Sequence, residues 1–256
     1  NALKKLNLKL DLTRGKPSEK QLSLSNALLN NLSPNSFKLN GVDIRNYGEI
    51  DGLPDAKKLG ASLLGVKSSN IIVNGTSSLN LTAAMMQTLF FRGNGDLSWK
   101  ERKKISILCP VPGYDRHFSL LEEMGINMIT VSMTGQGPNM DEVEAIIKKD
   151  KSVKGIICVP KHSNPTGETY SRETITRLAK LPKKSSKDFM LFYDNAYAVH
   201  DFKKSPKLSN IFKQCEKFKT SNNISLFAST SKITFAGSGI AFMGGSEKTI
   251  KTFVSY

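Results

Sequence analysis

The segment that decides the fold is Ile224-Ser225-Leu226-Phe227-Ala228-Ser229-Thr230-Ser231-Lys232, in which an apolar run ends in hydroxyl side chains and a lysine. The apolar run predicts a strand that is buried on both faces of a sheet. A lysine at the end of such a strand can lose its proton and form a Schiff base with an aldehyde. Glycines follow closely, which indicates a crowded backbone around Lys232; they are Gly237, Gly239, Gly244 and Gly245.

A second apolar run, Phe189–Tyr193, ends in Asp194-Asn195-Ala196-Tyr197. A carboxylate at this place can hold a pyridine nitrogen protonated. Together with Lys232, Asp194 forms the pair that pyridoxal phosphate (PLP) chemistry requires of a protein. The plainer alternatives are a helix cap for Asp194 and a surface position for Lys232. Asn164-Pro165-Thr166-Gly167 follows another predicted strand, although these are also ordinary turn residues.

A candidate phosphate site lies at Asn74-Gly75-Thr76-Ser77-Ser78, between a predicted strand and a predicted helix. Free backbone N–H groups and the helix dipole favour an anion there. The alternative is an ordinary turn with a serine N-cap. The sequence contains neither G-x-G-x-x-G nor G-x-x-x-x-G-K-[S/T], which disfavours dinucleotide-binding and nucleoside-triphosphate-binding folds.

An aromatic residue, Tyr114, follows the proline-containing end of another predicted strand. Its ring can stack on a planar cofactor. His117 lies three residues later, on the same face if a helix begins at Tyr114, and could contact Asp194. A single histidine at a helix start is more often structural.

Short apolar runs alternate with helical patterns, which predicts an α/β fold with a mostly parallel sheet flanked by helices. The expected strands are Asn70–Asn74, Lys104–Cys109, Asn127–Ser132, Lys154–Pro160, Asp188–Asp194, Asn223–Ser229 and Gly239–Gly244. The expected helices are Pro54–Leu64, Ser77–Phe91, Tyr114–Met124, Met140–Lys149 and Arg172–Leu181. Residues 46–256 form the expected large domain. Residues 1–45, with a helix at Ser18–Leu32, form an expected arm that belongs to a second, smaller domain. The segment Lys203–Ser221 is lysine-rich and weakly patterned, and is expected to be exposed.

The composition is that of a globular protein, with 256 residues, 39% of them apolar, and a formal net charge of +15. The positive charge could indicate a nucleic-acid partner. Scattered lysines and only seven arginines favour a solvated surface instead. No apolar run approaches the roughly 18 residues of a membrane-spanning helix, so no membrane association is expected. Cys109, Cys158 and Cys215 form no metal-binding pattern, and Cys109 and Cys158 end apolar runs, which predicts buried free thiols and a cytoplasmic location.

The N-terminal residues contain neither a signal peptide nor an initiator methionine. We therefore expect the chain to be a processed or partial copy of a longer one.

The motifs in this order resemble those of fold-type I PLP enzymes of the class I aminotransferase group, and more narrowly the branch of bacterial aspartate aminotransferases. The stretches that carry the resemblance are Leu12–Ser18, Arg45–Gly48, Ser163–Gly167, Asp194–His200 and Ser229–Gly237. The similarity covers nearly the whole chain. It implies PLP-dependent transamination, with aspartate and 2-oxoglutarate as the expected substrates.

The resemblance also implies a role for each matching residue. Lys232 would bond to the cofactor and move the substrate's Cα proton, and Asp194 would pair with the pyridine nitrogen. Asn164 and Tyr197 would hydrogen-bond the ring's phenolate oxygen.

The remaining implied contacts surround the ring, the phosphate and the substrate. Tyr114 would stack on the ring, and His117 would support Asp194. The phosphate would be held by Gly75, Thr76, Ser77 and Ser229. Tyr47 would reach the phosphate of the neighbouring subunit in a homodimer. Gly15 and Asn164 would lie near the substrate's α-carboxylate.

The chain departs from the family pattern in two places. Many relatives carry an arginine at the position of Ile240, and here local hydroxyls such as Ser231 or Ser238 would have to compensate. The family's C-terminal small domain does not follow Tyr256. The alternatives are another fold-type I reaction (β-elimination or decarboxylation), a DNA-binding regulator built on this fold, and an inactive relic.

Overall fold

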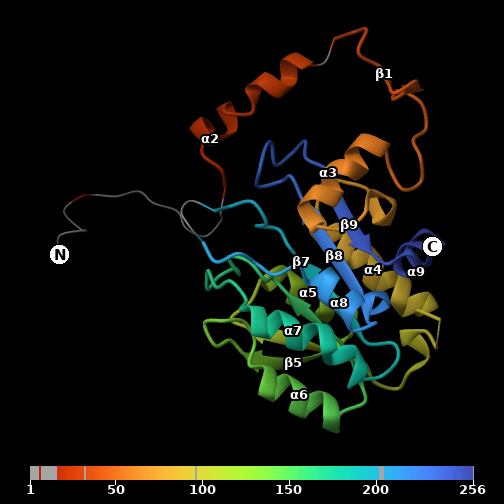
Figure 1. Ribbon diagram of the computed structural model, residues 1–256, viewed down its shortest axis with the longest axis vertical. Helices are drawn as coiled ribbons and strands as arrows, with labels where there is room; N and C mark the ends of the chain where they lie inside the picture. Colours follow the sequence, from red (N-terminus) through yellow and green to blue (C-terminus); the bar gives the residue numbers. More distant parts are fainter. Residues whose placement is uncertain (1–5, 7–15, 32, 96, 202–204, 256) are drawn as a thin grey trace. The chain divides into compact units, whose positions relative to one another are not determined.

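The computed structural model describes residues 6, 16–31, 33–95, 97–201 and 205–255 (Figure 1). The chain divides into two compact units, Asn1–Asn46 and Tyr47–Tyr256. This boundary lies one residue from the predicted one. That the first unit belongs to a smaller domain stays a prediction.

The first unit contains little regular structure. Helix α2 (Glu19–Ser23) is followed by a 3-10 helix, η1 (Asn26–Asn31), and by the short antiparallel pair β1 (Lys38–Leu39) and β2 (Val42–Asp43). The prediction of one helix over Ser18–Leu32 is therefore wrong. Ser18 and Gln21 form a capping box that starts α2. The asparagine-rich stretch that follows has low helix propensity, because asparagine side chains compete for backbone hydrogen bonds.

The second unit is built on a seven-stranded sheet in the order β3-β9-β8-β7-β6-β4-β5. The strands are β3 (Ile71–Val73), β4 (Ser106–Val111), β5 (Asn127–Ser132), β6 (Val153–Cys158), β7 (Met190–Asp194), β8 (Ile224–Ser229) and β9 (Ala241–Gly245). The pairs among β4 to β8 are parallel, and β9 is antiparallel to both of its neighbours. The mostly parallel α/β fold is confirmed, and each predicted strand has a counterpart within a few residues.

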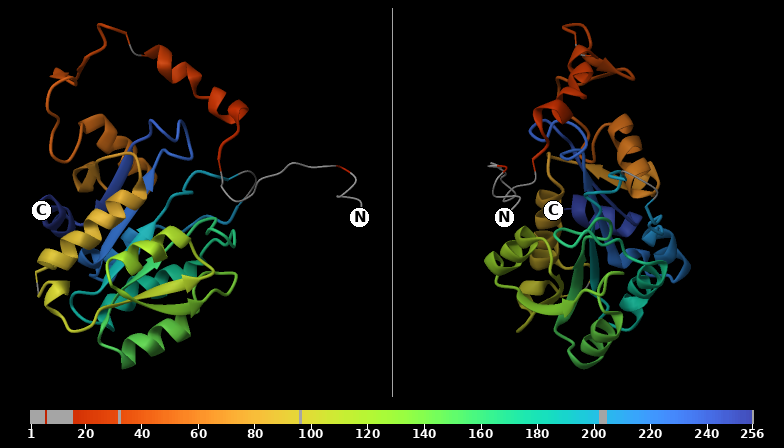
Figure 2. Two further views of the ribbon diagram at one scale, coloured as in Figure 1. Left: turned by 180° about the vertical axis from the view of Figure 1, so that it is seen from behind. Right: turned by 90° about the vertical axis from the view of Figure 1, so that its left-hand side faces the viewer.

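Helices cover both faces of this sheet (Figure 2). One core layer contains buried side chains of α3 (Pro54–Leu64), α6 (Met140–Lys149), α7 (Arg172–Lys180) and α8 (Ile211–Lys217). The other contains those of α4 (Ser78–Arg92), α5 (Asp115–Glu123) and α9 (Glu247–Val254). Successive residues of a strand alternate between the layers, so Leu191 and Tyr193 pack on the first and Met190 and Phe192 on the second. Among the helices of the described residues, none is long and apolar enough to cross a membrane.

The expectation that the segment Lys203–Ser221 is exposed is wrong for its second half. Helix α8 occupies this half and buries Ile211, Phe212 and Cys215. Its apolar stripe is only one helical turn long, and lysines flank it, so the composition hides the periodicity. Helix α9 was not predicted either.

The three cysteines are buried and free, as predicted for Cys109 and Cys158. Burial raises the pKa of each thiol to about 12. A thiol with such a pKa is a poor nucleophile at neutral pH.

A buried ion triad lies at the amino ends of β6 and β7. Asp188 is 3% exposed and lies 3.0 Å from Lys154 Nζ and 2.8 Å from an Arg102 nitrogen. Replacing Asp188 by asparagine leaves two cations without their counter-charge. We therefore expect Asp188→Asn to lower the free energy of unfolding by about 3–5 kcal/mol, measured by urea denaturation.

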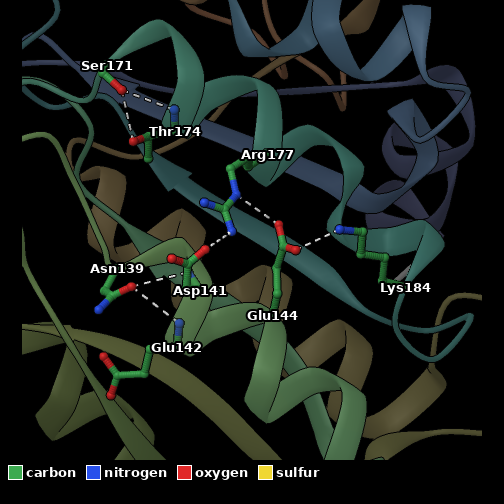
Figure 3. A network of polar contacts seen from close by, with 8 residues as sticks. All are labelled: Asn139, Asp141, Glu142, Glu144, Ser171, Thr174, Arg177 and Lys184. Atoms are coloured by element: carbon green, nitrogen blue, oxygen red, sulfur yellow. Dashed lines mark hydrogen bonds and ion pairs between the residues drawn. The ribbon is translucent and has the colours of Figure 1, made fainter.

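The matched control for this prediction is Asp141→Asn. Asp141 contacts Arg177 on the surface network between α6 and α7, where the aspartate side chain is 87% exposed (Figure 3). Exposed ion pairs contribute at most about 1 kcal/mol. If both variants lowered the free energy of unfolding equally, the buried triad would stabilise the fold no more than an exposed ion pair does.

The topology brings four loops to one edge of the sheet. Since β4, β6, β7 and β8 are parallel, their carboxyl ends lie at the same edge. The chain order of the strands reverses between β6 and β4. Ligands of open α/β sheets bind at the carboxyl edge, at such a reversal.

Candidate functional site

A cavity of about 500 Å³, counting its open mouth, lies at this carboxyl edge. Its lining residues come from the loops after four strands and from the start of α4: Ser77, Ser78, Leu79, Tyr114, Val159, Asn164, Asp194, Ala196, Tyr197, Ser229, Ser231 and Lys232. Eight of them are predicted site residues that lie far apart in the sequence. Ser78, Leu79, Val159 and Ala196 were not predicted. Leu79 lies in the first turn of α4, and the other three each adjoin a predicted residue or a strand end.

Asp194 is the last residue of β7. Its side chain lies on the same face of the strand as those of Met190 and Phe192, which is the face toward α4 and α5. His117, in α5, places Nε2 3.2 Å from Asp194 Oδ2. The side chains are 2% and 5% exposed. The pair is close enough for an ion pair but lacks hydrogen-bond geometry. Asp194 Oδ1 is buried with no hydrogen-bond partner among the described residues.

The phenol of Tyr197 lies beside Asp194 and Asn164. Burial and the Asp194 carboxylate raise the pKa of Tyr197, and a hydrogen bond with Asn164 partly offsets this. Tyr197 is thus protonated at neutral pH and can donate a hydrogen bond. Tyr114 precedes α5, and its ring makes an edge contact with that of His117, with centroids 5.1 Å apart.

Lys232 lies in a turn three residues after β8, where the amides of Ile233 and Thr234 donate to Thr230 O. Its Nζ is 5.1 Å from the centre of the Tyr197 ring. The side chain is exposed. The strand before it is fully buried, as predicted, but the lysine itself stands at the open mouth of the cavity.

The start of α4 also lines the cavity. Ser77 is its N-cap, but its hydroxyl makes no capping hydrogen bond. Gly75 has φ +63°, a conformation that favours glycine, and a Cβ there would meet only open space. Ser231 Oγ donates to Thr76 O at 2.7 Å, and Ser229 Oγ donates to Ser231 Oγ at 3.1 Å. Backbone N–H groups and hydroxyls thus gather at a helix N-terminus.

Besides His117, three predicted residues do not line the cavity, and one more lies outside the described residues. Tyr47 is fully exposed and is not among the residues that line the cavity. Gly75 and Thr76 form the turn before α4 but do not line the cavity themselves. Gly15 lies outside the described residues.

Ile240, at the family's arginine position, packs against the core layer of α3, α6, α7 and α8. No arginine lines the cavity within the described ranges. The cluster at the start of α4 therefore offers hydroxyls and amides. Nor do the described residues place three or more His, Cys, Asp or Glu side chains to hold a metal ion.

The family model described as "Aspartate amino-transferase" matches residues 1–256. The chain belongs to the aspartate aminotransferase family. It is 41% identical to an aspartate aminotransferase of Corynebacterium glutamicum over 99% of its own length and 59% of that protein's. A Mycolicibacterium smegmatis protein named as an aminotransferase is 40% identical over 97% of this chain and 59% of its own length.

Solved structures of aminotransferases have the same fold. An aspartate transaminase of Corynebacterium glutamicum superposes with a TM-score of 0.91 at 41% identity, over 99% of this chain and 60% of its own. The α-aminoadipate aminotransferase LysN of Thermus thermophilus, solved with N-(5'-phosphopyridoxyl)-L-leucine, has a TM-score of 0.70 at 16% identity, over 93% and 55% of the two chains. The chain spans about 59% of the length of the curated relatives it matches.

The family resemblance implies PLP, and the residues present fit that group in three respects. The buried Asp194 Oδ1 lacks a partner, which a pyridinium N–H would supply. The start of α4, with Ser77 not acting as a side-chain cap, is suited to a phosphate. Lys232 and the protonated Tyr197 line the same cavity, and the amine lies 5.1 Å from the centre of the Tyr197 ring.

Proposed function

We propose that the protein catalyses PLP-dependent transamination between an amino acid and a 2-oxo acid, with aspartate and 2-oxoglutarate as substrates. The observation that carries the proposal is the convergence of Lys232, Asp194, Asn164 and Tyr197 on one cavity. Asp194 ends β7 instead of capping a helix, and Lys232, although exposed, lines the same cavity. The name of the Corynebacterium glutamicum relative supports the choice of aspartate.

When bound, PLP supplies an aldehyde carbon and a pyridinium ring that withdraws electrons from the substrate's Cα. The chain supplies the remaining functions. The Lys232 amine would hold the cofactor at its aldehyde group and would serve as the base that moves the proton at the substrate's Cα. The Asp194 carboxylate would keep a proton on the pyridine nitrogen. Tyr197 and Asn164 would donate hydrogen bonds to the ring oxygen. The start of α4, with Ser229 and Ser231, would hold the phosphate by neutral hydrogen bonds.

The proposal includes a cytoplasmic homodimer. Tyr47 is fully exposed, which is compatible with a contact to a neighbouring subunit. The three buried free thiols support a reducing compartment.

The test is product analysis of the full chain reconstituted with PLP. With aspartate and 2-oxoglutarate, we expect oxaloacetate and glutamate in equal amounts, measured by coupled dehydrogenase assays. With aspartate alone, one equivalent of oxaloacetate should form per bound cofactor, because the amino group stays on the cofactor. Release of ammonia or carbon dioxide instead would contradict transamination and favour another reaction of this fold type.

A further inference from the structure

His200 joins the turn of Lys232 to the loop that follows β7. Its Nε2 lies 2.9 Å from the backbone carbonyl oxygen of Lys232, 32 residues further along the chain. Its ring also meets the ring of Tyr197 edge-on, with centroids 5.6 Å apart and planes at 82°. The His200 side chain therefore contacts both Lys232 and Tyr197, two residues that line the cavity.

The contact with Lys232 determines which imidazole nitrogen carries the hydrogen. A carbonyl oxygen only accepts hydrogen bonds, so Nε2 must be the donor. Nδ1 is buried and has no hydrogen-bond partner among the described residues. The orientation of the ring is thus set by its hydrogen bond to Lys232 and its edge contact with Tyr197.

The residues next to His200 in the same loop are held separately. Asp201 accepts from Lys161 Nζ at 2.6 Å and lies 3.1 Å from His162 Nε2. Lys161 also donates to Ala198 O at 3.0 Å. These contacts tie the loop to the segment after β6, which carries Asn164. They do not involve Lys232. Besides the approach of the Lys232 amine to the Tyr197 ring, the hydrogen bond of His200 joins this loop to the backbone of the Lys232 turn.

We propose that His200 is a positioning residue that holds the Lys232 turn against Tyr197, so that the amine reaches the cofactor's aldehyde in a fixed place. This inference rests on the proposed function of Lys232 and Tyr197. The physical reason is that Lys232 is exposed on a flexible four-carbon side chain, so the position of its amine depends on how firmly its backbone is held. A displacement of about 1 Å from a reactive geometry can slow a reaction by about 10²-fold.

The first test uses the chain without cofactor. Amide hydrogen exchange of Ile233 and Thr234, whose N–H groups close the Lys232 turn, reports how often this turn opens. We expect His200→Ala to speed this exchange about fivefold, as the loss of one hydrogen bond would. His200→Gln keeps an N–H donor at similar reach and should exchange like the wild type.

The second test measures the rate of covalent attachment of PLP to Lys232, by borohydride trapping and mass spectrometry of the modified peptide. We expect His200→Ala to slow attachment about tenfold, and His200→Gln to restore the wild-type rate. The matched control is His162→Ala, because His162 holds the same loop at Asp201, where Lys161 remains. His162→Ala should change neither the amide exchange of the Lys232 turn nor the rate of PLP attachment.

The outcomes separate this proposal from the proposed function. Wild-type exchange and attachment in His200→Ala would overturn the role of His200. So would failure of His200→Gln to restore them, or an equal effect of His162→Ala. If PLP does not attach to Lys232 in the wild type, the proposed function is wrong, and faster exchange in His200→Ala would still show that His200 holds this turn.

Discussion

Replacing Lys232 by alanine is expected to abolish covalent attachment of PLP and to lower the transamination rate at least about 10⁴-fold. The reason is that one amine performs two functions. It bonds to the cofactor, and it moves the proton at the substrate's Cα. No other lysine lines the cavity among the residues that the structure describes, so no neighbouring amine is placed to replace it.

The measurements are the visible absorbance of the reconstituted protein and the rate of oxaloacetate formation. The control is Lys207→Ala, which removes an exposed lysine that lines a different cavity. It should leave both readouts unchanged. Stability should change little in Lys232→Ala, because the side chain is exposed. A Lys232→Ala protein that keeps its absorbance band and its activity would show that the reactive lysine lies elsewhere.

The fold and most of the cavity could be predicted because each motif follows a strong strand signal. The runs that became β7 and β8 are apolar throughout, and parallel strands place their carboxyl ends at one edge. Two neighbouring parallel strands that end at Asp194 and Ser229 therefore predict that these two residues lie close together. Strand alternation also explains why Asp194 faces α5 and His117 rather than the opposite helix layer.

The remaining features depend on contacts that no local pattern encodes. The apolar side chains of α8 form a single turn among lysines, which is too short for periodicity to reveal. The exposure of Lys232 follows from a turn that carries it beyond the buried strand. His200 lies in a stretch that resembles the family, but its contact with Lys232 spans 32 residues and becomes visible only in three dimensions.

Asp194→Asn is expected to lower the transamination rate about 10²- to 10³-fold, which corresponds to the loss of a close charge pair in a buried site. The amide has nearly the same shape but carries no charge, so it no longer holds the proton on the pyridine nitrogen. The measurement is the rate of the half-reaction with aspartate, compared with Asp194→Glu, which keeps the charge but displaces it. A wild-type rate in Asp194→Asn would contradict the role assigned to this carboxylate.

The same variant is expected to leave the cofactor-free chain as stable as the wild type, or more stable. Asp194 is a buried carboxylate with an oxygen that lacks a hydrogen-bond partner, and burying such a charge is unfavourable. Asp188 presents the opposite case, because two cations surround it, and its amide variant should unfold far more easily. Urea denaturation of both variants without PLP tests this contrast. If Asp194→Asn were as destabilising as Asp188→Asn, Asp194 would be a structural counter-charge. If Asp194→Asn keeps the wild-type free energy of unfolding but loses the half-reaction, the buried charge serves ligand binding and does not stabilise the fold.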